Sequence, residues 1–195
     1  MLNILVTGVG GQGTVLFARL IGSAAISSGY AVKGTETIGM AQRGGSVVSH
    51  LRIGELINSP LIPLEKADLI IAFEPAEAVR SLPYLSKEGK LLTLDAPIQP
   101  VTASLTGKGY EAAEMLGFLK ANVSNLSVLS SAELARGSGS AKVINVAMLG
   151  FVLAKGWLPF EEEALLAVLN ERIPKRFLEL NIKALNTGKE YAQWN

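Results

Sequence analysis

The sequence predicts an α/β domain of three layers, in which a doubly wound, mainly parallel sheet of the Rossmann-like type is covered by helices on both faces. Short runs of consecutive apolar residues, typical of strands buried on both faces, alternate along the chain with segments of helical periodicity. A glycine-rich turn joins the first apolar run to the first helical segment. The C-terminal third carries helical periodicity alone, so we expect it to be helical.

The first strand is predicted at residues 4–6, and the segment after the turn carries apolar residues at helical spacing. Gly29 favours the end of this helix. Residues 30–33 are predicted to form a second strand. Residues 35–46 show neither a helical nor an alternating period and contain three glycines. We therefore expect a long loop there, of the kind that often carries function in compact domains.

Four further strands are predicted at residues 46–53, 68–73, 90–94 and 126–129. Pro75 follows the strand at residues 68–73 and favours the start of a helix. An amphipathic helix is predicted at residues 110–121, and residues 102–110 fit either a loop or an edge strand. Helices are also predicted at residues 142–154, 161–170 and 175–185.

The composition fits one domain over residues 1–195. The formal net charge of +1 comes without a basic run, so we expect no nucleic acid as a partner. The most apolar stretch, residues 143–154, is too short to cross a bilayer, and the first strand begins too early for a signal peptide. We expect no membrane association and a cytoplasmic location. The absence of cysteine excludes a thiolate nucleophile and the usual ligands of an iron–sulfur cluster.

The helix predicted at residues 143–154 is apolar all round. Such a helix should be covered on every side by its own domain or by a partner. We therefore expect the protein to work as an oligomer, through apolar helix surface in the C-terminal third.

The glycine turn, Gly8-Val9-Gly10-Gly11-Gln12-Gly13, has the spacing G-x-G-x-x-G between a strand and a helix. Glycine lets the chain turn sharply and leaves no side chain between the backbone and a ligand. The free N–H groups at the start of the following helix favour an anion. Two interpretations stay open: the turn binds a nucleotide-like anion, or its glycines only let the strand and the helix pack closely.

Two charged residues near the long loop suit ligand binding. Glu36 lies 23 residues past Gly13, where a dinucleotide-binding fold places the acid that holds the ribose. Gln42-Arg43-Gly44-Gly45 sets a guanidinium beside backbone that two glycines leave accessible, which suits a phosphate or a carboxylate. The alternatives are a solvated glutamate and a surface turn whose arginine faces a partner.

His50 is the only histidine, and no serine–acid pair with triad spacing accompanies it, so we interpret it as structural. Asn145 is the only polar side chain in residues 143–154. If buried, it needs a partner from a backbone group, an amide of the glycine turn or a ligand. No residue pattern supplies an electrophile, a redox centre or an activated nucleophile, so the chain alone lacks the parts of a complete enzyme.

Residues 36–48, ETIGMAQRGGSVV, together with the glycine turn, resemble the gamma-type subunit or domain of 2-oxoacid:ferredoxin oxidoreductases. Within that family the resemblance is strongest to the beta subunit of indolepyruvate:ferredoxin oxidoreductases. It extends over nearly the whole chain, with supporting matches at residues 49–52, 59–63, 73–78 and 145–150. Ile38 departs from the pattern, because relatives often carry a more polar residue there, which leaves the identity of the 2-oxoacid open between an aryl pyruvate and another acid.

The resemblance implies a subunit that supports oxidative decarboxylation, in which a 2-oxoacid and coenzyme A give acyl-coenzyme A, carbon dioxide and reduced ferredoxin. It implies that thiamine diphosphate, magnesium and the iron–sulfur clusters belong to partner subunits, which also reduce ferredoxin. This chain would hold no cofactor alone and would share coenzyme A as a substrate. It implies a hetero-oligomer, with a homodimer as the form of the isolated chain.

No catalytic or metal-ligating residue is expected in this chain. The residues expected to face coenzyme A or another cofactor are Gly8, Gly10, Gly11, Gln12, Gly13, Glu36, Gly39, Met40, Gln42, Arg43, Gly44, Gly45 and Asn145. Two other functions compete with the resemblance. One is a free-standing dinucleotide-binding redox or sensor protein of Rossmann-like fold, and the other is a structural partner whose glycine turn binds nothing. A dinucleotide-binding protein has no evident need for the loop at residues 35–46.

Overall fold

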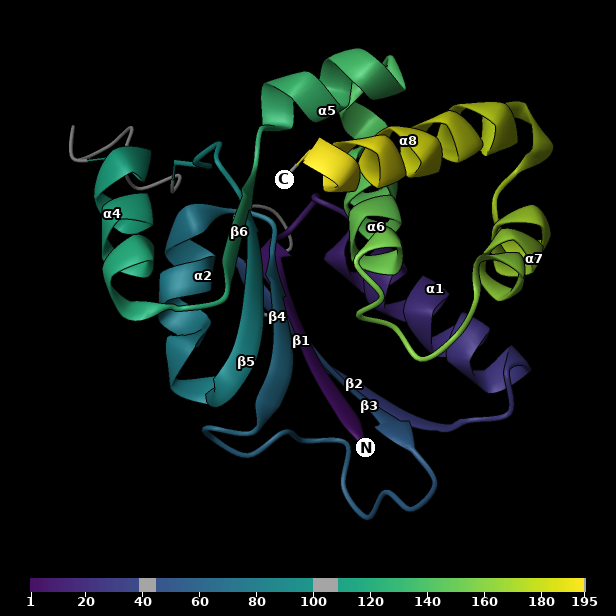
Figure 1. Ribbon diagram of the computed structural model, residues 1–195, viewed down its shortest axis with the longest axis horizontal. Helices are drawn as coiled ribbons and strands as arrows, with labels where there is room; N and C mark the ends of the chain where they lie inside the picture. The colour runs from purple at the N-terminus through teal and green to yellow at the C-terminus, as the bar shows by residue number, and fades with distance from the viewer. Residues whose placement is uncertain (39–44, 100–108, 195) are drawn as a thin grey trace.

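The computed structural model describes residues 1–38, 45–99 and 109–194, and a six-stranded sheet lies at its centre (Figure 1). The strands are β1 (Leu2–Val9), β2 (Ala31–Ile38), β3 (Ser46–Gly54), β4 (Ala67–Ala72), β5 (Leu85–Leu94) and β6 (Leu126–Leu129). The helices are α1 (Thr14–Ser27), α2 (Pro75–Ser81), α4 (Ala112–Asn122), α5 (Ser131–Ser138), α6 (Ile144–Ala154), α7 (Glu162–Arg172) and α8 (Lys175–Trp194). Short 3₁₀ turns lie at Leu82–Tyr84 and Ala141–Val143.

Helices cover both faces of the sheet, which confirms the predicted three-layer α/β fold. Helices α1, α6, α7 and α8 lie on one face, and α2 and α4 lie on the other (Figure 1). Each face has its own buried apolar cluster, because the strands alternate their side chains between the two sides. The helical C-terminal third was also predicted, although α8 extends to Trp194 rather than ending near residue 185.

The strand order is β2-β3-β1-β4-β5-β6. The β1–β4, β4–β5 and β5–β6 pairs are parallel, as predicted for a mainly parallel sheet. In contrast, β3 runs antiparallel to both β1 and β2 and lies between them. The connection from β2 to β3 spans only residues 39–45, too few for the crossover that a parallel pair requires. The second strand is therefore not the neighbour of the first.

Residues 35–38 were predicted to belong to the long loop, and this prediction is wrong. They continue β2, where Thr35 lies opposite His50 and Thr37 lies opposite Val48. The backbone of this segment pairs with β3. A stretch rich in glycine and threonine can form a strand without an alternating pattern of apolar residues, so the sequence pattern did not indicate this pairing. Strand β5 likewise begins at Leu85 rather than at residue 90.

The apolar helix predicted at residues 142–154 is α6, and every residue from Asn145 to Val152 in it is buried. Helix α8 crosses it so closely that a Cβ at Gly150 would lie 2.0 Å from the carbonyl oxygen of Leu185. A Cβ at Gly188 of α8 would lie 1.7 Å from the carbonyl oxygen of Ala147. The domain itself covers this helix, so α6 does not supply the apolar surface that was expected to hold an oligomer together.

Helix ends follow the sequence signals where a capping residue is present. Glu74 caps α2, with Pro75 in the first turn, and Gly29 has a left-handed φ of 88° just after α1. Helix α4 begins at Ala112 rather than at residue 110, and Leu119 is its buried apolar residue. This helix therefore packs on the sheet through a narrower stripe than its amphipathic spacing predicts.

Candidate functional site

The glycine turn, residues 8–13, joins the carboxyl end of β1 to α1 (Figure 1). A Cβ at Gly8 would lie 2.7 Å from Oε1 of Gln12, so no larger side chain fits there. Gly11 and Gly13 have left-handed φ angles of 106° and 81°, which glycine adopts without strain. A Cβ at Gly11 would meet nothing within 4 Å. Close packing explains Gly8, whereas the backbone of Gly11 is accessible to a ligand.

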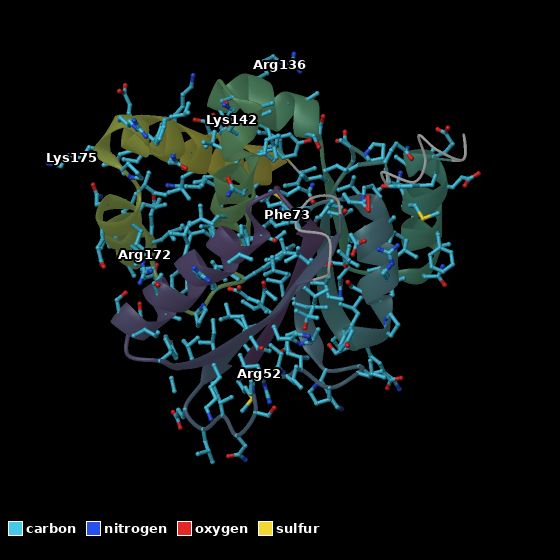
Figure 2. The ribbon with its side chains drawn as sticks, turned by 180° about the vertical axis from the view of Figure 1, so that it is seen from behind. Arg52, Phe73, Arg136, Lys142, Arg172 and Lys175 are labelled. Atoms are coloured by element: carbon cyan, nitrogen blue, oxygen red, sulfur yellow. The ribbon has the colours of Figure 1, made fainter. Side chains whose placement is uncertain are left out.

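The side chain of Gln12 braces the glycine turn from inside. Its Oε1 accepts a hydrogen bond of 2.7 Å from the N–H of Val9, and its Nε2 donates one of 2.7 Å to the carbonyl oxygen of Phe73. Phe73 follows β4, and Figure 2 shows it near the middle of the molecule. Gln12 thus ties the ends of two neighbouring parallel strands together, and a ligand would have to displace one of these bonds to reach its amide.

The glycine turn contacts the end of the second predicted binding segment. The N–H of Gly10 donates a hydrogen bond of 2.9 Å to the carbonyl oxygen of Gly45, one residue before β3 begins. The two segments that the resemblance combines therefore meet. The other predicted residues of this segment, Gly39, Met40, Gln42, Arg43 and Gly44, lie outside the described residues, and their roles stay predictions.

Asn145, in the first turn of α6, reaches the glycine turn from the helical layer. Only 8% of this residue is exposed, and a Cβ at Gly13 would lie 2.6 Å from its Nδ2. Its Oδ1 accepts a hydrogen bond of 2.9 Å from the N–H of Val146, and Nδ2 has no hydrogen-bond partner within the described residues. The first backbone bond of α1 runs from Phe17 to Gly13, so the N–H groups of residues 14–16 have no acceptor within the helix. The arrangement offers several donors to an anion.

Two buried carboxylates at the start of α2, neither of them among the predicted site residues, hold the chain around this edge of the sheet. Glu74 accepts hydrogen bonds from the N–H of Glu77, at 2.9 Å, and from the hydroxyl of Tyr110. Glu77 accepts one of 2.6 Å from Ser46, the first residue of β3, and pairs with Arg80. Burial raises the pKa of Tyr110, and the neighbouring Glu74 carboxylate raises it further.

The sequence predicted only part of the role of Glu74 and Glu77. Glu74-Pro75 predicted a helix start, and that capping role is confirmed. The bonds to Ser46 and Tyr110 join residues 31 and 36 positions apart, and no local pattern encodes such contacts. Glu74 thus holds Tyr110, and Glu77 holds the start of β3. Within the described ranges no three acidic or histidine side chains cluster as metal ligands do.

Glu36 lies on β2 and forms an ion pair of 3.3 Å with Arg19 of α1. A dinucleotide-binding fold places its ribose-binding acid at the end of the strand beside β1, so that the acid faces the ligand on the glycine turn. Here β3 occupies that position. The topology therefore differs from the one that the dinucleotide interpretation of Glu36 requires.

His50 lies on the other face of β3 from α1. Its Nδ1 accepts a hydrogen bond of 3.2 Å from the N–H of Ile62, and its ring packs edge-on against Tyr84 at 5.6 Å between centroids. Burial lowers the pKa of His50. The structural interpretation of this residue agrees with its surroundings.

Comparison with known proteins decides the family. The model of the family described as pyruvate ferredoxin/flavodoxin oxidoreductase matches residues 3–191. The chain belongs to this family. An indolepyruvate oxidoreductase subunit, IorB of Archaeoglobus fulgidus, is 39% identical over 193 residues, which cover 98% of this chain and 95% of that subunit. The resemblance to 2-oxoacid:ferredoxin oxidoreductases that the glycine turn and residues 36–48 indicated is thus confirmed.

Solved structures share the fold of this family member. The gamma subunit of a keto/oxoacid ferredoxin oxidoreductase from Geobacter sulfurreducens aligns over 100% of both chains, with a TM-score of 0.70 and 23% identity. A 2-oxoglutarate:ferredoxin oxidoreductase from Magnetococcus marinus, solved with 2-oxoglutarate, coenzyme A and succinyl-CoA bound, aligns over all of this chain and 31% of its own. That alignment has a TM-score of 0.73 and 20% identity.

The membrane question rests on helix length and composition. Among the helices that the structure describes, no single one is long and apolar enough to cross a bilayer. Ser131–Ser138 and Ala141–Ala154, a pair bent by 104°, are together long and apolar enough by length and composition only. The cytoplasmic location stays a prediction.

Proposed function

We propose that this chain is the subunit without a redox centre of a 2-oxoacid:ferredoxin oxidoreductase of the indolepyruvate or pyruvate type. In that role it supports the conversion of a 2-oxoacid and coenzyme A into acyl-coenzyme A and carbon dioxide, with two electrons passing to ferredoxin. The observation that carries the proposal is the near full-length match, at 39% identity, to the indolepyruvate oxidoreductase subunit of Archaeoglobus fulgidus.

The residues of this chain bear on which subunit of the complex holds the cofactors. The chain has no cysteine, the residue that ligates iron–sulfur clusters. We therefore assign the clusters to a partner subunit. The family resemblance implies that thiamine diphosphate and magnesium also belong to that partner, so we expect the isolated chain to be inactive. The partner would supply the electron-accepting chemistry and reduce ferredoxin, and this chain would complete the assembly beside coenzyme A.

The glycine turn is our candidate for the contact with coenzyme A. Three observations support it: the accessible backbone at Gly11, the free amides at the start of α1, and Nδ2 of Asn145 beside Gly13. Coenzyme A carries phosphate groups, the anions that such a helix start favours. In the proposal Arg43 adds a guanidinium that fits a phosphate in two-point contact.

The test is activity of the reconstituted complex. The chain is co-expressed with the thiamine-binding subunit, and 2-oxoacid-dependent reduction of ferredoxin is followed while coenzyme A is varied. Gly11→Asp sets a carboxylate at the open face of the turn. Because the added carboxylate repels the phosphates of coenzyme A, we expect the KM for coenzyme A to rise about ten- to a hundredfold with the KM for the 2-oxoacid unchanged.

The matched control is Gly29→Asp, at the other end of α1, since this glycine also has a left-handed φ and open space around it. It should leave both KM values unchanged. Arg43→Lys, which keeps the charge and loses the planar fork, should raise the KM for coenzyme A without dissociating the subunits. A chain that never associates with a thiamine-binding subunit, and instead binds NAD alone, would contradict the proposal.

A further inference from the structure

A second hollow lies away from the glycine turn, between α1 and the β2–β3 hairpin. We call it the hairpin cavity, and it has a volume of about 440 Å³. Its floor is made by Gly34 and Glu36 of β2 and by Ser49 and Leu51 of β3. One side of α1 forms its wall, and Arg172, the last residue of α7, borders it. Figure 2 shows Arg172 beside α1 on the face of the molecule opposite to that of Figure 1.

Two glycines keep the hairpin cavity open. A Cβ at Gly34 would lie 3.5 Å from the nearest atom, and one at Gly22 of α1 would lie 3.4 Å from Leu51. Neither glycine has a left-handed φ, so the backbone does not require glycine at either position. A larger side chain would fit sterically and fill the space. The volume is within the range of small-molecule pockets.

The floor carries a polar group without a partner. The side chain of Ser49 lies on the α1 side of the sheet, because it is opposite Val6 of β1, which packs into the apolar cluster of that face. Only 1% of Ser49 is exposed, and its hydroxyl has no hydrogen-bond partner within the described residues. A buried hydroxyl without a partner costs stability, so the floor of the cavity is not optimised for the stability of the free chain.

The charges of the cavity are unbalanced. Arg19 contacts Oε1 of Glu36 through Nε at 3.3 Å, and within the described residues the other carboxylate oxygen and the terminal nitrogens of Arg19 have no partner. Arg172 forms no ion pair with any carboxylate that the structure describes. The lining residues therefore include two arginines, Arg19 and Arg172, whose side chains are largely exposed, and one carboxylate, Glu36. The cavity suits an anionic group together with a hydrogen-bond donor for the free oxygen of Glu36.

The apolar lining residues of the hairpin cavity indicate which kind of side chain the ligand carries. Ile26, Val32 and Leu51 offer aliphatic surface, and the one ring among the lining residues, His50, points its side chain to the other face of β3. No ring in the described part of the cavity can stack on a nucleobase, which argues against a nucleotide.

We propose that the hairpin cavity binds a small α-amino or α-hydroxy acid with an apolar side chain. Its carboxylate meets Arg172 and the terminal nitrogens of Arg19, its α-ammonium or α-hydroxyl donates to Glu36 beside Ser49, and its side chain lies on Ile26, Val32 and Leu51. The proposal is independent of the function proposed above, because it uses none of the residues of the glycine turn.

The test measures binding to the purified chain by isothermal titration calorimetry and ligand-observed NMR. L-phenylalanine and L-phenyllactate represent the two sources of the α-donor. Phenylpropionate lacks the donor and phenethylamine lacks the carboxylate, so each should bind about tenfold or more weakly. Adenosine monophosphate tests the nucleotide alternative. Binding of adenosine monophosphate in preference to both acids would overturn the assigned class.

Three variants connect binding to the cavity. Arg172→Ala should weaken binding about tenfold or more, because a charge-assisted contact is lost. Gly34→Val should abolish binding by filling the floor, while the strand keeps its fold. Ser49→Ala should raise the unfolding temperature of the free chain, because it removes the unpartnered hydroxyl, and it reports any effect of floor stability on binding.

Arg176→Ala is the matched control, since Arg176 is an exposed arginine on α8 that lies over Phe177 and does not border the cavity. It should leave affinity unchanged. The proposal is overturned if neither acid binds at millimolar concentration, or if binding is the same in Arg172→Ala and Gly34→Val as in the parent chain.

Discussion

Amide side chains fix the glycine turn from two sides. Gln12 connects the N–H of Val9 to the carbonyl oxygen of Phe73, and Nδ2 of Asn145 lies where it would crowd a Cβ at Gly13. These contacts brace the turn, and its open backbone is at Gly11. Rigid placement matters for anion binding, because a donor that is already oriented loses little entropy when the ligand arrives.

The contact between Gly13 and Asn145 gives a prediction for stability. Gly11→Ala should cost about 1–2 kcal/mol, the penalty of a left-handed conformation for a residue with a Cβ. Gly13→Ala should cost more, because its Cβ would lie 2.6 Å from Nδ2 of Asn145. Adding Asn145→Ala should remove the extra cost, as a coupling of about 0.5–3 kcal/mol in a double-mutant cycle followed by urea unfolding. Equal costs for both glycine variants would contradict the contact.

The positions of helices and strands could be predicted where a local sequence pattern marks them. The order in which the strands pair could not be predicted from such patterns. The runs at residues 68–73 and 126–129 are bounded by turn signals, and both proved to be strands with nearly those limits. The place of β3 beside β1 depends on which edge the hairpin docks against, which no local period encodes. For the same reason Glu36 could be located on the chain, but its ion pair with Arg19 could not be foreseen.

The site shows the same limit. The glycine turn and Asn145 were recognised by residue type and by position in an apolar helix, and the structure brings them together. Glu77 was not recognised, because a glutamate in the first turn of a helix is ordinarily explained by the helix dipole. Its bond to Ser46 exists only because β3 returns to this edge of the sheet.

Helix packing supports a prediction at the scale of elements. Gly150→Ala should destabilise the chain by about 3 kcal/mol or more, because its Cβ would lie 2.0 Å from backbone of α8. Gly117→Ala is the control on α4, where a Cβ meets nothing within 4 Å, and it should stabilise by about 0.5–1 kcal/mol through helix propensity. Thermal and urea unfolding would measure both. A neutral Gly150→Ala would contradict the close crossing of α6 and α8.

At the scale of the whole molecule, the sheet is the common support of both layers. The helices of the C-terminal third close the face that carries α1, and the apolar helix α6 is buried within that layer. Under the proposed function, contacts to a partner subunit would therefore use surfaces other than α6. The hydrogen bond from Gly10 to Gly45 lies next to Gly11, whose backbone is exposed.

The pH dependence of the free energy of unfolding tests whether His50 is buried in the folded chain. Burial lowers the pKa of His50 in the folded chain below its ordinary value of 6.5. As the pH falls through 6.5, the unfolded chain therefore binds a proton before the folded chain does, and the stability contributed by the neutral imidazole is lost from that pH downward. The loss has a limit of about 1.4 kcal/mol per pH unit for one proton.

The expected outcome is a steeper fall in the free energy of unfolding below this pH for the parent chain than for His50→Asn. Asparagine keeps an acceptor for the N–H of Ile62, where Nδ1 of His50 now accepts a bond of 3.2 Å, and it does not titrate. The carboxylates contribute equally to both proteins, so the difference between the two curves isolates the imidazole. Urea titrations at intervals from neutral to mildly acidic pH provide the measurement. Parallel curves would mean that His50 takes up its proton as readily in the folded chain as in the unfolded one, in contradiction to its burial against Tyr84.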